Sequence, residues 1–140
     1  MTNVATGRRG EEETATKRAE KTVLIVDASE ETRDVLTTAL ERRGVRALAF
    51  PTSRRAAATA RTDRPDLVIF DVETETVPPR QALDAFARDA ELDETPIVAI
   101  GTARFEAPLG ERGFVSKPYH FAPLLEKIEA LLRDAETRND

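Results

Sequence analysis

Short, continuous apolar runs constrain the fold of this chain more than any other feature. The clearest are residues 23–26, 67–70 and 97–100, with a shorter run at 114–115 and a weaker candidate at 45–50. A run that is apolar throughout, rather than at alternate positions, is typical of a strand buried on both faces, as in a parallel sheet. We therefore expect a parallel sheet of five strands.

Helical patterns fill the intervals between the runs. Ser29 is predicted to cap a first helix that ends at Gly44, and Ser53 a second one. A third helix is expected from about residue 80 to 89, and a last one follows residue 120. Their predicted apolar faces are, in order, Val35, Leu36, Ala39 and Leu40; Ala56, Ala57 and Ala60; Ala82, Leu83 and Phe86; and Leu124, Leu125, Ile128, Leu131 and Leu132.

Strands that alternate with helices imply right-handed crossovers and a sheet covered on both faces, which is a doubly wound α/β fold. The 140 residues fit one domain. Residues 1–20 have almost no large apolar side chain and are predicted to form a disordered N-terminal arm. The folded domain is expected over 21–134, with a C-terminal tail at 135–140.

Composition and charge exclude several functional classes. The net charge is −5 with no evident basic face, which argues against nucleic acid as a direct partner. No apolar run is long enough to cross a bilayer, and residues 1–10 lack the apolar centre of a signal peptide, so we expect a cytoplasmic protein. The chain has no cysteine, which excludes disulfides and thiolate metal sites.

Chemically capable side chains follow the predicted strands at the point where each strand ends. They are Asp27 after the first run, Asp71 after the third, Gly101 and Thr102 after the fourth, and Lys117 with Pro118 after the fifth. Because functional groups in parallel sheets gather at the carboxyl ends of the strands, two carboxylates and one ammonium are expected at one edge.

Asp71 is the most informative of these residues. A carboxylate at the end of a buried strand can bind a hard cation or attack phosphorus as a nucleophile. The structural alternative is an ordinary aspartate that caps a turn. Since Asp27 and Lys117 stand at matching strand ends, we favour the functional interpretation.

From about residue 22 to 132 the chain resembles the receiver domain of two-component response regulators. The matching pieces are Val-Leu-Ile-Val-Asp (23–27), Arg-Pro-Asp-Leu-Val-Ile-Phe-Asp-Val (64–72), Thr-Pro-Ile-Val (95–98) and Gly-Phe-Val-Ser-Lys-Pro-Tyr (113–119). The resemblance implies a flavodoxin-like three-layer sandwich. It also implies that Asp71 accepts a phosphoryl group from a kinase histidine, with Mg²⁺ held by Asp71 and acids after the first strand.

The resemblance assigns further roles at the same edge. Lys117 would pair with the phosphoryl group, and the peptide bond before Pro118 would be cis. A Ser or Thr after the fourth strand would bond the phosphoryl group, and an aromatic residue, here Phe114, would act as a second switch position.

Several positions depart from the family pattern. Ala28 stands at the second acidic position, and Gly101 stands at the Ser/Thr switch position, with Thr102 next to it as a substitute hydroxyl. Glu73 could replace the missing metal carboxylate, pair with Lys117, or lie in solvent, and the last reading is the one we favour. The interval from Gly101 to Lys117 is short, so the fourth helix is predicted to be reduced to one turn or a loop.

Three functions remain open at this point. We favour a stand-alone, atypical receiver that is not an enzyme and acts through a histidine kinase or another signalling protein, with weak or lost phosphorylation; a homodimer is compatible with it. The alternative is a working Mg²⁺-dependent phosphoacceptor modified at Asp71. An aspartate-nucleophile phosphohydrolase is disfavoured, because residues 71–75 do not match its Asp-x-Asp-x-Thr pattern. His120 is predicted to be a surface residue rather than a ligand.

Overall fold

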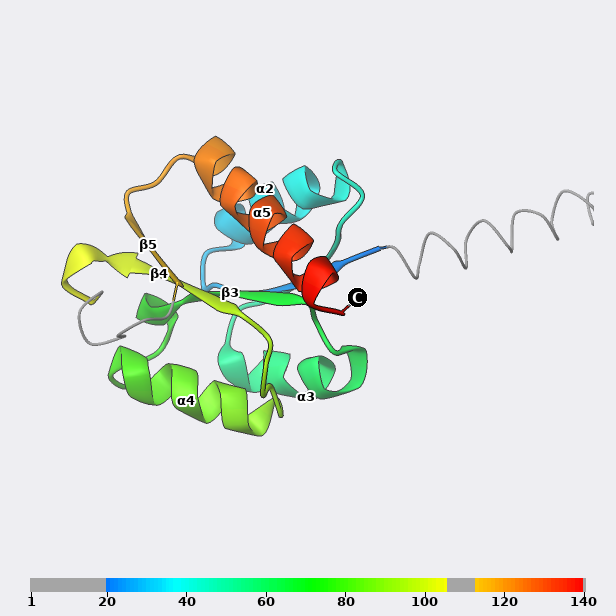
Figure 1. Ribbon diagram of the computed structural model, residues 1–140. Coiled ribbons are helices and arrows are strands. Elements are labelled where there is room, and N and C mark those ends of the chain that lie inside the picture. The colour runs from blue at the N-terminus through cyan, green and yellow to red at the C-terminus, as the bar shows by residue number, and fades with distance from the viewer. Residues whose placement is uncertain (1–19, 106–112, 140) are drawn as a thin grey trace, which may run out of the picture.

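The computed structural model describes residues 20–105 and 113–139 of the chain (Figure 1). The predicted N-terminal arm, apart from residue 20, lies outside the described residues. None of the described helices is both long enough and apolar enough to cross a bilayer.

Five parallel strands form one sheet in the order β2-β1-β3-β4-β5. The predicted α/β fold with a doubly wound parallel sheet is therefore confirmed. Each apolar run of the sequence becomes a strand, including the weak candidate at 45–50. β1 and β3 are buried along their whole length, whereas β2 is only partly buried. The strands are β1 (Thr22–Val26), β2 (Arg46–Phe50), β3 (Leu67–Asp71), β4 (Ile97–Thr102) and β5 (Gly113–Lys117).

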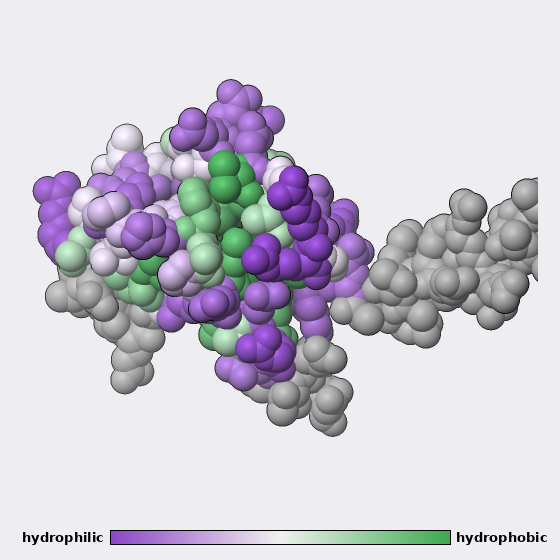
Figure 2. All heavy atoms as spheres, turned by 90° about the horizontal axis from the view of Figure 1, so that it is seen from above, coloured by the Kyte–Doolittle hydropathy of each residue, from purple (hydrophilic) through white to green (hydrophobic). Residues whose placement is uncertain are grey.

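Four α-helices cover the two faces of the sheet in the described part of the chain. Helices α2 and α5 lie on one face and α3 and α4 on the other, which gives three layers (Figure 1). Seen from the α2–α5 side, hydrophobic residues gather near the middle and hydrophilic residues surround them (Figure 2). The helices are α2 (Glu30–Glu41), α3 (Ser53–Asp63), α4 (Pro79–Asp89) and α5 (Phe121–Asn139), with 3-10 turns η1 (Val72–Thr74) and η2 (Ala103–Phe105).

Two helix starts show what the sequence did and did not determine. Ser29 caps α2 as predicted, since its hydroxyl accepts the backbone N–H of Thr32 at 3.1 Å. The cap of α3 is Thr52, and the prediction of Ser53 was wrong by one residue. The Thr52 hydroxyl accepts a backbone N–H of the first turn, which leaves the Ser53 side chain for a contact described below.

Other predicted boundaries also shift. Helix α2 ends at Glu41, and Gly44 follows in the turn with a φ of +78°, a conformation that glycine adopts without strain. Val35 was predicted to face the core but is 39% exposed. Helix α5 continues past residue 134 into the expected tail. Between β4 and β5 the described residues hold only η2, while residues 106–112 lie outside them.

Candidate functional site

The site lies where the strand order reverses, between β1 and β3, which is where doubly wound sheets place their ligands. Val26 pairs with Phe70 in the sheet, so the residues that follow them, Asp27 and Asp71, stand side by side. On the other side of β3, Thr102 pairs with Lys117. The carboxyl edge of the sheet therefore brings together the side chains that the sequence placed there.

Asp71 is buried, with only 5% of its surface exposed. Both of its carboxylate oxygens have protein partners. Oδ1 accepts the backbone N–H of Glu73 at 2.8 Å, which caps η1, and Oδ2 lies 2.6 Å from the Lys117 Nζ. Asp71, which directly follows the apolar residues of β3, is therefore held in one orientation by these two contacts.

Asp27 is as deeply buried as Asp71, and burial is the main reason that its pKa rises from 3.8 to about 6. The Ser29 backbone N–H bonds its Oδ1 at 2.8 Å and opposes the rise. The Asp71 carboxylate adds to it through its charge and a hydrogen bond between the two carboxyl groups. The pair is therefore electrostatically costly at neutral pH, and a cation at this position would relieve that cost.

Lys117 supplies the positive charge of the site. Its ammonium pairs with Asp71 and also with Glu73, whose Oε1 lies 3.1 Å away. Burial alone would lower the pKa of Lys117, but the hydrogen bonds to Asp71 and Glu73 outweigh it and raise the pKa above 10.5. Glu73 is exposed, as expected, and it also forms the ion pair with Lys117 that the sequence left open, because one ammonium with three donors reaches both carboxylates.

Ala28 offers no side-chain ligand, but its backbone N–H takes part in the site. It donates to the Thr74 hydroxyl at 2.9 Å, which links the β1–α2 loop to the segment after Asp71. Arg33 donates to the carbonyl of Asp27 at 2.8 Å and fixes the same loop. Sequence reasoning missed Thr74 and Arg33, since neither lies in a motif and each contact depends on how the loops fold back.

Gly101 sits against a side chain that leaves no room for a larger residue. A Cβ built there would lie 2.8 Å from Cγ2 of Val72 and 3.3 Å from the Phe105 ring. Real Cβ atoms essentially never approach that closely, and Val72 is buried and stiff at χ1. The packing of Val72 therefore explains a glycine at the position where the family pattern has a hydroxyl.

We expect Gly101→Ala to lower the free energy of unfolding by about 1–3 kcal/mol, the usual cost of overpacking. Chemical denaturation of the purified protein measures it. The double variant Gly101→Ala with Val72→Ala should lose less than the sum of the two single losses, because the second change removes the clash. Additive losses would show that Val72 does not restrict this position.

The remaining predicted residues lie around this centre. The Thr102 hydroxyl is buried and has no hydrogen-bond partner. Phe114 is half-buried and packs against the core under α3 and α4. The Lys117–Pro118 peptide bond is cis. His120 is exposed, as the sequence predicted. Tyr119 was not predicted; its pKa rises through burial and through the charges of Asp27 and Asp71.

The donor set allows a test of whether Mg²⁺ fits. No three acidic or histidine side chains converge on a metal position within the part of the chain that the structure describes. Mg²⁺ is nevertheless bound in many proteins by one or two carboxylates, with waters and phosphate oxygens completing the octahedron. Asp27 and Asp71 provide such a pair, so they fit the ion with one carboxylate fewer than the family pattern, and Glu73 is turned to Lys117.

Comparison with known families agrees with this geometry. The model of the response regulator receiver domain matches residues 23–129. The chain belongs to the receiver domain family. A curated relative, Protein PilH of Pseudomonas aeruginosa, is 30% identical over 116 residues, which cover 79% of this chain and 96% of that protein.

Solved structures of receiver domains share the fold. Chemotaxis protein CheY4 of Vibrio cholerae superposes with a TM-score of 0.68 at 24% identity, over 80% of this chain and 98% of that one. A CheY-like receiver domain protein from Methanospirillum hungatei gives 0.72 at 21% identity, over 85% and 98%. This receiver domain is thus one module of two-component signalling.

Proposed function

We propose that this receiver domain accepts a phosphoryl group at Asp71 only weakly and signals mainly through contacts with a histidine kinase or another signalling protein, rather than as an enzyme. In the transfer, an Asp71 carboxylate oxygen forms a bond to phosphorus while the bond from phosphorus to the donor nitrogen breaks. Mg²⁺ held by Asp27 and Asp71 would neutralise charge on the phosphoryl oxygens.

The observation that carries this proposal is the shared ammonium of Lys117. It contacts Asp71 at 2.6 Å and Glu73 at 3.1 Å. An incoming phosphoryl group has to compete with the Glu73 carboxylate for Lys117, and that carboxylate also repels it. The absence of a carboxylate at Ala28 acts in the same direction. It lowers the affinity of the site for Mg²⁺, the cation that would offset the charge of the phosphoryl group.

The working phosphoacceptor remains the second candidate, and one observation favours it. Asp27, Asp71 and Lys117 are all present in one cluster, with the Asp71 oxygen held against the ammonium. The two candidates differ in the strength of phosphoryl binding and not in the residue that carries it.

Ala28→Asp separates the two candidates. With a third carboxylate beside Asp27, the apparent affinity for beryllofluoride in the presence of Mg²⁺ should rise at least about tenfold, a difference of ~1.4 kcal/mol. Beryllofluoride mimics the phosphoryl group on an aspartate, and NMR titration or calorimetry measures its binding. Asp71→Asn should abolish binding in both backgrounds.

Thr38→Asp is the matched control, because Thr38 is exposed in the last turn of α2, which runs away from this edge. It adds the same charge and should leave the affinity unchanged. If the unaltered protein is modified completely by acetyl phosphate and Mg²⁺, and Ala28→Asp adds nothing, weak phosphorylation is wrong and the second candidate stands.

A further inference from the structure

Three consecutive side chains after β3 connect the site to three separate elements. Glu73 pairs with Lys117 at the end of β5. The Thr74 hydroxyl accepts the N–H of Ala28 in the β1–α2 loop, and Glu75 accepts the hydroxyl of Ser53, at 2.8 Å, at the start of α3. We propose that residues 73–75 form a tie that transmits the charge on Asp71 to the N-terminal end of α3.

The Asp71 end of the tie cannot stay unchanged when Asp71 is modified. Oδ1 caps η1 through the N–H of Glu73, and Oδ2 holds Lys117. A group bonded to either oxygen removes one of these two contacts. An added dianion also attracts Lys117 more strongly than Glu73 does and repels the Glu73 carboxylate, so it releases Glu73 from the ammonium.

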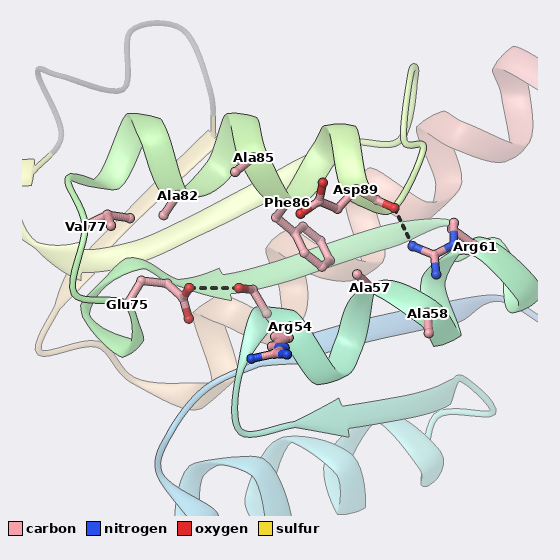
Figure 3. A pocket seen from close by; sticks show the side chains of 11 residues that line it. Arg54, Ala57, Ala58, Arg61, Glu75, Val77, Ala82, Ala85, Phe86 and Asp89 are labelled. Atoms are coloured by element: carbon pink, nitrogen blue, oxygen red, sulfur yellow. Dashed lines mark hydrogen bonds between the residues drawn. The ribbon is translucent and has the colours of Figure 1, made fainter.

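The far end of the tie lies at a groove of about 530 Å³ between α3 and α4 (Figure 3). The bond between Glu75 and Ser53 spans the groove near the start of both helices. A second bond, from Arg61 to the carbonyl of Asp89 at 2.6 Å, spans it near their ends. Val77, 39% exposed, also lines the groove, so the segment that contacts Lys117 continues directly into its wall.

The packing of α3 against α4 is loose enough for the far end of the tie to move when Glu73 is released. Four of the nine residues of α3 and α4 that line the groove are alanines, namely Ala57, Ala58, Ala82 and Ala85, so few side-chain atoms fix the two helices to one another at these positions. Loss of the Glu75–Ser53 bond would remove one of the two polar links across the groove described above. The α3–α4 surface is therefore the part of the molecule whose packing changes when the charge on Asp71 changes.

The β4–β5 side offers a weaker route. Gly101 has no hydroxyl to follow a phosphoryl group, and the described residues between β4 and β5 form only the η2 turn. This inference rests on the proposed function only in one respect, that phosphorylation of Asp71 supplies the added charge. The three links of the tie are present in the unmodified protein.

Glu73→Gln tests the tie without phosphorylation. It removes the carboxylate charge, keeps the side-chain shape, and weakens the link to Lys117. Hydrogen exchange should become about two- to fivefold faster at the amides of Arg55 and Ala56 in the first turn of α3, and their NMR signals and that of Val77 should shift. Glu126→Gln, at an exposed position of α5, is the matched control and should alter none of them.

Ser53→Ala provides the second arm. It removes the far link, so adding Glu73→Gln to it should produce no further change at α3. Changes confined to residues 71–74 and 117 in Glu73→Gln, with α3 equal to the control, would overturn the tie. Beryllofluoride with Mg²⁺ should move the same α3 signals; an absence of any binding contradicts phosphorylation at Asp71, while the Glu73→Gln result still decides the tie.

Discussion

Lys117→Met is expected to lower the free energy of unfolding by about 2–4 kcal/mol at pH 7.5, near the range for breaking a buried ion pair. The change leaves the Asp71 carboxylate, whose side chain is 7% exposed, without its counter-ion and next to the Asp27 carboxyl group. The Glu73 carboxylate loses its partner as well. Methionine retains the length of the apolar stem, so the loss reports the ammonium. Urea unfolding measures it.

Lys127→Met is the control, because Lys127 is exposed on α5, and its effect should stay within about 0.5 kcal/mol. Adding Asp71→Asn to Lys117→Met should recover part of the loss. The raised pKa of Lys117 determines the pH range in which its ammonium stabilises the fold. Its contribution is fully present below pH 10.5 and is lost as the pH rises through the folded pKa, so the difference between the proteins should shrink there. Equal stability of Lys117→Met and the unaltered protein at pH 7.5 would show that the ammonium does not stabilise the buried carboxylates.

The strands could be predicted because burial on both faces leaves a continuous apolar run that is visible in the sequence. The ends of the helices were harder. Both Thr52 and Ser53 are residue types that can cap a helix; Thr52 caps α3, while Ser53 bonds Glu75 of a distant segment, which the local sequence does not reveal. The exposure of Val35 likewise depends on how α2 lies on the sheet, which its own sequence does not specify.

The centre of the site could be predicted for a topological reason. Parallel strands end at one edge, so Asp27, Asp71 and Lys117 had to converge once the strands were known. The pairing of Glu73 with Lys117 was one of three readings that the sequence left open, because it depends on the reach of one lysine. The contact of Thr74 could not be predicted, because it depends on the path of a loop. The family pattern located the departures at Ala28 and Gly101, but only the structure shows that Val72 accounts for the glycine.

Asp27→Asn should raise the free energy of unfolding by about 2–3 kcal/mol at pH 7.5. The pKa of Asp27 is about 6 in the folded protein against 3.8 for the free group, so the folded state holds an ionised carboxylate that burial disfavours. An asparagine can still accept the Ser29 N–H through its Oδ1, and its amide can donate to Asp71. Thermal or urea unfolding across pH measures the effect, with Asp34→Asn on the exposed face of α2 as the control.

The sign of the pH dependence follows from the same shift. Between pH 3.8 and about 6 the folded protein binds more protons at Asp27 than the unfolded chain, so stability falls as the pH rises through this window. The Asp27→Asn variant should lack this fall, and millimolar Mg²⁺ should stabilise the unaltered protein more than the variant. A destabilised Asp27→Asn variant at pH 7.5 would contradict the raised pKa. A stabilised one means that the carboxylate at this position weakens the fold, which is expected of a residue kept for the chemistry of its site.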